Sequence, residues 1–143
     1  MKKKRTKLAD RAMPKYTAKE EMLNMITHIV GGAFAVGVLI ICLVTVFTRG
    51  NVWSKIGGSI YGVSLVALYT VSSVYHGLNA GKGKKVMRII DHCTIYFLIA
   101  GTYTPILLVS VREVAPITSW VIFGVIWGLS FLAITLTAID LDK

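Results

Sequence analysis

The chain has 143 residues, of which 55% are hydrophobic and 16% are charged, and its mean hydropathy is +0.67. A soluble domain carries about 25% charged residues, so this composition excludes an ordinary soluble enzyme and indicates a membrane protein. The two cysteines, Cys42 and Cys93, both lie in apolar segments. They provide neither a disulfide framework nor a C-x-x-C metal or redox motif.

Four apolar segments are long enough to cross a bilayer. A helix rises about 1.5 Å per residue, so roughly 20 apolar residues span a hydrocarbon core about 30 Å thick. In chain order the segments are residues 25–47, 56–75, 89–111 and 116–139, and all their connections are short. The first is longer than a signal-peptide core, and no A-x-A-like cleavage site follows it, so we interpret it as a retained anchor. We predict an all-α bundle of four membrane helices, with a basic leader at residues 1–19 and a membrane domain at residues 20–143.

The net charge of +9 is distributed in a way that predicts membrane topology rather than nucleic-acid binding. Eight basic residues precede the first segment, four lie between the second and third, and one closes the chain, whereas the alternate connections carry three. By the positive-inside rule the N-terminus is cytoplasmic. We therefore expect a multi-pass protein of the cell (plasma) membrane, in bacteria the inner membrane, and a leader whose role is topological.

Small and special residues inside the segments predict close helix packing. Pairs of small residues four apart let helix backbones approach each other, and Pro105 is expected to bend its helix by removing a backbone hydrogen bond. Aromatic residues near segment ends favour the membrane interface. The small pairs are Gly31 with Ala35, Gly58 with Gly62 and Gly124 with Gly128, and the interfacial aromatics are Trp53, Tyr103 and Trp120.

Polar side chains from three segments lie at one membrane depth, the predicted cytoplasmic end. Ionisable groups inside a membrane are costly and by default mark a functional site facing other helices. A bundle would bring these residues together into one polar layer, which is the main functional signal of the sequence. They are Glu20, Glu21, Asn24 and His28 in the first segment, Ser72, Ser73 and His76 in the second, and Asp91 and His92 in the third.

The residue types in this layer suit metal-assisted chemistry. A neutral imidazole such as His76 is a good zinc ligand, and a carboxylate such as Asp91 can orient a ligand or accept a proton from a water on the metal. Ser72 lies four residues before His76, on the same helical face, and could bond that water or an oxyanion. Plainer interpretations remain open, because His76 could be an interfacial or hydrogen-bonded histidine, His28 could bond a neighbouring helix, and Asp91 could be a helix N-cap. Asp91 and His92 are neighbours about 100° apart, so only one can face the centre of the site.

Three motifs in order resemble the bacterial hemolysin III proteins, the prokaryotic branch of the progestin and adipoQ receptor family. The motifs are EEMLNMITHIVGG, SSVYHG and RIIDHCTIYFLIAGTYTP, and the resemblance covers roughly residues 20–140. It implies a fold of seven membrane helices with a cytoplasmic N-terminus. It also implies a zinc ion held near the cytoplasmic leaflet by three histidines, one from an S-x-x-x-H motif in the second helix and two from an H-x-x-x-H motif in the seventh.

Carried over to this chain, the resemblance assigns a role to most residues of the layer. His76 is the implied zinc ligand, with Ser72 beside the metal and Asp91 beside the zinc water as catalytic groups. The residues implied to support the site are Glu20 or Glu21, Asn24 and His28. Ser73 and His92 are predicted to line it from their place in the polar layer alone. Related zinc membrane proteins, including alkaline ceramidases, cleave lipid amides, so the resemblance implies a zinc-dependent hydrolase of membrane lipids.

The chain departs from the family pattern at its end. It has four segments and three histidines, none of them after His92, so the H-x-x-x-H pair is absent. We therefore expect an incomplete Zn2+ site and no hydrolase activity from this chain alone. Its partners are expected to be membrane lipids and either a second copy or the missing helices, with no nucleic acid. The alternative function is a non-enzymatic protein, either pore-forming and cytolytic or regulating membrane state, with structural zinc.

Overall fold

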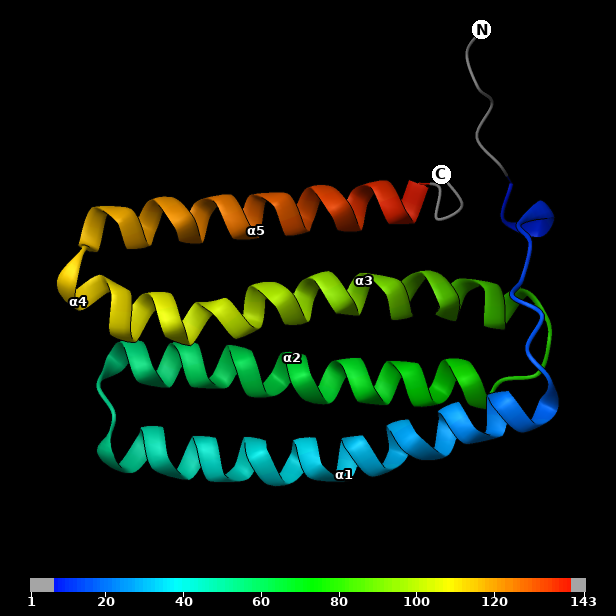
Figure 1. Ribbon diagram of the computed structural model, residues 1–143, viewed down its shortest axis with the longest axis horizontal. Helices are drawn as coiled ribbons and strands as arrows, with labels where there is room; N and C mark the ends of the chain where they lie inside the picture. Colours follow the sequence, from blue (N-terminus) through cyan, green and yellow to red (C-terminus); the bar gives the residue numbers. More distant parts are fainter. Residues whose placement is uncertain (1–6, 140–143) are drawn as a thin grey trace, which may run out of the picture.

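The computed structural model describes residues 7–139, which are helical almost throughout and contain no strand. A short 3-10 helix, η1, precedes four long helical stretches that run back and forth (Figure 1). Each stretch is long and apolar enough to cross a membrane, so the prediction of an all-α protein with four membrane helices is confirmed. The elements are η1 (Leu8–Asp10), α1 (Ala18–Arg49), α2 (Val52–Gly77), α3 (Lys82–Pro105), the π-helix η2 (Ile106–Val111), α4 (Arg112–Val114) and α5 (Pro116–Ile139).

The helices lie side by side in an open row rather than around a common centre. Among the described residues, α1 packs on α2, α2 on α3 and α3 on α5, while the backbone of α1 lies close to neither α3 nor α5. Figure 1 shows this order plainly, with α1 and α5 at the two outer edges. Each inner helix therefore has two neighbours and each outer helix has one.

Glycines set the close approach of α1, α2 and α3, as the small-residue pairs predicted. A Cβ atom added to Gly58 would meet Cys42 and Val46 of α1, and one added to Gly62 would meet Leu39 of the same helix. Gly57 lies directly against the backbone of Pro105 on α3.

The pair on α5 is different. Neither Gly124 nor Gly128 has an atom within 4 Å of an added Cβ, so this pair makes no helix contact among residues 7–139.

Pro105 marks the point where the third helical stretch changes from an α-helix to a π-helix. It ends α3 and is followed directly by the π-helix η2, which fits a residue that lacks a backbone N–H and crowds the preceding turn. The Ser119 hydroxyl of α5 donates a 2.7 Å hydrogen bond to the Leu107 carbonyl in η2. This end of the row also holds Trp53 and Trp120, whose rings meet edge to face at 5.6 Å.

Residues 11–16, which we call the N-terminal strap, cross the opposite end of the row. Arg11 is 5% exposed, and its Nη2 donates a 2.6 Å hydrogen bond to the carbonyl of Ile139, at the end of α5. Arg88 of α3 donates from Nη1 to the carbonyl of Ala12 at 2.8 Å. The sequence predicts only a topological role for the leader, but this part of it is bound to the helix ends. Residues 1–6 lie outside the described residues.

Candidate functional site

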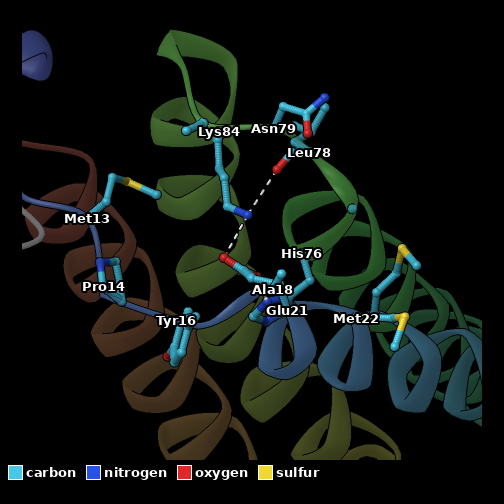
Figure 2. Close-up of a pocket in the computed structure, with 13 residues that line it drawn as sticks. Met13, Pro14, Tyr16, Ala18, Glu21, Met22, His76, Leu78, Asn79 and Lys84 are labelled. Carbon is cyan, nitrogen blue, oxygen red and sulfur yellow. Dashed lines mark hydrogen bonds and ion pairs between the residues drawn. The ribbon is translucent and has the colours of Figure 1, made fainter.

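The predicted polar layer lies at the end of the row that the strap crosses, which we call the basic end. Here α1 and α3 begin and α2 and α5 finish (Figure 1). A pocket of about 540 Å³ opens there between the strap, the first turn of α1, the end of α2 and the start of α3. Figure 2 shows the side chains of Tyr16, Glu21, His76 and Lys84 around it.

The start of α1 decides which of its two glutamates enters the site. Thr17 caps the helix, because its hydroxyl accepts from the Glu20 N–H at 3.3 Å while the Glu20 carboxylate accepts from the Thr17 N–H at 2.7 Å. This capping box keeps Glu20 exposed on the outside of the first turn. Glu21 follows about 100° further round the helix and faces α2 and α3. Of the two glutamates that the sequence left open, Glu21 is the one in the site.

Glu21 joins three helices through its two carboxylate oxygens. Its Oε2 lies 2.7 Å from Nδ1 of His76 on α2, and its Oε1 lies 2.7 Å from Nζ of Lys84 on α3. The side chains are 20% exposed in Glu21, 9% in His76 and 8% in Lys84. The contacts are therefore partly withdrawn from water. In such surroundings a charge-assisted hydrogen bond is stronger than on an open surface.

The hydrogen bond to Glu21 fixes the tautomer of His76. A carboxylate has no proton to donate, so Nδ1 of His76 must be the donor. In a neutral imidazole the other nitrogen, Nε2, then carries the lone pair. Histidines that bind metals are held in this way by a carboxylate or carbonyl on the second ring nitrogen.

Aromatic rings surround His76. The His28 ring of α1 stacks on it, with centroids 5.7 Å apart and planes 7° from parallel. Tyr75 lies at 4.6 Å and Tyr16 of the strap at 6.0 Å, both tilted. Nδ1 of His28 donates a 2.8 Å hydrogen bond to the backbone carbonyl of Asn24. The structure therefore brings the predicted residue His28 to His76, while Asn24 contributes a carbonyl rather than its side-chain amide.

The third-helix residues separate as their spacing predicts. The Asp91 side chain is 14% exposed and that of His92 is 39% exposed, with His92 Nδ1 donating to the Arg88 carbonyl at 2.8 Å. The Asp91 side chain is thus the more buried of the two, and its Oδ2 lies 3.7 Å from Nδ1 of His92, so the two side chains stay in contact. Asp91 lies well inside α3, whose N-cap is Gly81, so the N-cap interpretation of Asp91 is wrong.

The two predicted serines differ in their surroundings. Ser72 is buried at 5% exposure, one turn deeper than His76 on α2. The Ser73 hydroxyl donates to the Tyr69 carbonyl at 2.7 Å, which satisfies it within its own helix. Among the described residues neither Ser72 nor Asp91 hydrogen-bonds His76. The catalytic roles of Ser72 and Asp91 stay predictions.

Sequence reasoning missed Lys84 and the strap residues. The third segment was predicted from residue 89, but α3 begins at Lys82, so Lys84 was treated as one of several topological charges in a loop. Extending the helix back to Lys82 would have placed Lys84, Arg88 and Asp91 on one face, spaced by four and three residues. No pattern in the leader marks Tyr16 as a neighbour of His76.

The site as described does not form a complete metal centre. Residues 7–139 contain no group of three or more His, Cys, Asp or Glu side chains placed to hold a metal ion. A catalytic zinc ion is normally held by three protein ligands. His76 fits one of these ligands, because its Nδ1 is held by Glu21 and its Nε2 carries the lone pair. The described residues place no two further ligands beside it.

Comparison with known proteins agrees with the motifs. The family model "Haemolysin-III related" matches residues 16–143. Hemolysin-3 of Bacillus cereus is 38% identical over 112 residues, covering 78% of this chain and 50% of that protein. The Hemolysin-3 homolog of Bacillus subtilis (strain 168) is 37% identical over 115 residues, covering 80% of this chain and 53% of that protein.

A more distant relative is human. Monocyte to macrophage differentiation factor is 39% identical over 74 residues, which cover 47% of this chain and 29% of that protein. No solved structure matches the chain. The chain spans about half the length of the two bacterial relatives. Its helices, its motifs and these matches identify it as a multi-pass membrane protein that belongs to the hemolysin III family.

Proposed function

We propose that this chain forms the first part of a zinc-dependent hydrolase of membrane lipids, in which His76 supplies one metal ligand. The observation that carries the proposal is the 2.7 Å hydrogen bond from His76 Nδ1 to Glu21, which leaves Nε2 with its lone pair. Because the described residues hold no complete donor set, the remaining ligands come from outside residues 7–139. When bound, zinc acts as a Lewis acid that polarises a carbonyl and activates water.

The other polar residues have separate tasks in this proposal. Asp91, on the inward face of α3, accepts a proton from the attacking water, as a carboxylate can at neutral pH. Ser72, buried one turn below His76, donates a hydrogen bond to the substrate oxyanion. Glu21 orients His76, and His28 packs against its ring.

We also propose that the basic end faces the cytoplasm across the plasma membrane. This orientation rests on the distribution of the basic residues, 13 on one side and 3 on the other. The substrates are then membrane lipids reached from the cytoplasmic leaflet. The open edge of α5, where Gly124 and Gly128 meet no other helix of residues 7–139, receives further helices or a second copy.

A second candidate function is cytolysis without catalysis. The printed names of the two bacterial relatives, Hemolysin-3 and its homolog, favour it. In that case zinc would be structural, and the ion would have no open coordination position.

The two functions are separated by one set of variants in a form that carries the family's seven spans. His76→Ala is expected to lower the zinc content, whereas Asp91→Asn keeps the zinc and loses lipid hydrolysis, because proton transfer needs the carboxylate. His92→Ala is the control for zinc content, since Nδ1 of His92 is occupied by the Arg88 carbonyl and the side chain is 39% exposed; its hydrolysis is not compared, because Nδ1 lies 3.7 Å from Asp91. Zinc is measured by elemental analysis and hydrolysis by mass spectrometry of lipid products.

Equal zinc in the wild type and in His76→Ala would overturn the ligand assignment. Leakage of dye from lipid vesicles that survives Asp91→Asn, with no lipid product in any sample, would support the cytolytic function instead.

A further inference from the structure

Lys84 is a buried lysine in a place where a lysine is unfavourable. Its side chain is 8% exposed, and lysines are almost never this buried unless they are paired. It also lies in the first turn of α3, where the helix dipole disfavours a positive charge, and that turn contains no acidic residue. Something outside α3 must compensate the burial of this ammonium group.

The compensation comes from the two neighbouring helices. Nζ of Lys84 lies 2.7 Å from Oε1 of Glu21 on α1 and donates a 2.9 Å hydrogen bond to the carbonyl of Leu78. Leu78 is the C-cap residue directly after the last residue of α2, two positions after His76. The ammonium group also lies over the ring of Tyr75, 5.3 Å from its centroid. Figure 2 shows both polar contacts converging on Lys84.

These contacts divide the two oxygens of Glu21 between two partners. Lys84 holds Oε1, and Oε2 receives the Nδ1–H of His76. With one oxygen held by α3, the carboxylate cannot rotate about its last bond without breaking a short charged contact. The Leu78 contact holds the same lysine to the end of the helix that carries His76. The result is a closed connection from α3 through α1 to the imidazole on α2.

We propose that Lys84 is a positioning residue for His76: it fixes the Glu21 carboxylate, which fixes the ring orientation and leaves Nε2 facing the site. The inference rests on the proposed function, which gives Nε2 its ligand role. It adds α3 to α1 and α2 as the helices whose side chains determine the orientation of Nε2. The nearby Lys82 is exposed, so we assign it no positioning role.

The test reads the tautomer of His76 directly, with no metal and no lipid substrate present. The 143-residue chain is labelled with 15N-histidine and studied by NMR in detergent micelles, and His76→Ala identifies the His76 signals. The spectra are recorded above about pH 8, where an ordinary imidazole is neutral. The wild type is then expected to show a hydrogen-bonded Nδ1–H and an Nε2 without a proton. Lys84→Met should lose the Nδ1–H signal and give the tautomer mixture of a free imidazole. Lys84→Arg, which restores a donor, should regain the signal, and the matched control Lys82→Met should keep it.

Far-UV circular dichroism accompanies each sample, and if Lys84→Met loses helix content, Lys84→Gln takes its place as the uncharged variant. A folded Lys84→Met or Lys84→Gln protein with the wild-type tautomer would overturn the proposal. So would a wild type in which His76 carries its proton on Nε2. Because the readout needs no zinc, a chain that passes this test and lacks hydrolysis in its longer form would refute the proposed function and leave the positioning role standing.

Discussion

Substituting Gly57 by alanine tests whether α2 and α3 depend on direct backbone contact. A Cβ at this position would lie 2.7 Å from Cα of Pro105 and 3.1 Å from its Cβ. The first separation is about 0.7 Å shorter than the 3.4 Å at which ordinary van der Waals contact begins. The obstructing atoms belong to a proline backbone next to the π-helix, so they cannot turn aside as a flexible side chain would. The two helices must move apart.

The expected magnitude follows from two opposing effects. Overpacking of this kind costs about 1–3 kcal/mol. Replacing glycine by alanine inside a helix raises the free energy of unfolding by about 0.5–1 kcal/mol, because the unfolded chain loses conformational freedom. The free energy of unfolding of Gly57→Ala should therefore fall, by up to about 2.5 kcal/mol.

Gly128→Ala is the control, because among residues 7–139 no atom beyond the local backbone of α5 lies within 4 Å of the added methyl group. Only the favourable helix effect remains there, so its free energy of unfolding should stay level or rise by up to about 1 kcal/mol. Both variants are unfolded with sodium dodecyl sulfate in mixed micelles and followed by far-UV circular dichroism. Equal changes in the two variants would refute the close-contact argument.

Three further outcomes are expected. In intact cells, an impermeant thiol reagent should label a Glu113→Cys variant but not a Gly81→Cys variant, both made without the two native cysteines; the reverse pattern would overturn the proposed orientation. Arg11→Ala removes a charge-assisted hydrogen bond to Ile139 that is worth about 1.5–3 kcal/mol. The thiol of a Met13→Cys variant in detergent should then be labelled about tenfold faster or more. An unchanged labelling rate would show that the strap is held by other contacts. The 143-residue chain dialysed against a weak chelator should retain no stoichiometric zinc, since the described residues form no group of three donors; about one zinc per chain, lost on His76→Ala, would show that this chain builds its own site.

Hydrophobic length was enough to predict the four membrane helices, whereas the orientation that charge bias indicates stays a prediction. Burial of a backbone in lipid allows little besides a helix, so about 20 apolar residues in a row determine the element almost without regard to its neighbours. The residues at which the helices begin were predicted less accurately. α1 and α3 both begin seven residues earlier than predicted, because polar residues such as Lys84 continue a helix beyond the apolar part.

The polar layer was visible in the sequence for a similar reason. Polar residues at one depth on three helices must lie at one end of the row, whatever the packing. Spacing also predicted that Asp91 and His92 point in different directions, and their side chains differ in exposure, 14% against 39%, although they stay within 3.7 Å of each other. The catalytic roles of Asp91 and Ser72 stay predictions.

Tertiary structure alone decided which side chains meet. Glu20 and Glu21 are equivalent in sequence, and only the capping box of α1 and the place of α2 assign one to solvent and the other to His76. Lys84 acquires its role because α3 packs against α2, and α2 against α1, in an open row that no residue pattern specifies. The Gly58–Gly62 and Gly124–Gly128 pairs read alike, yet one meets a helix and the other meets none among residues 7–139. Local periodicity predicts which face of a helix carries small or polar residues. Which helix packs against that face depends on the packing of all the helices together.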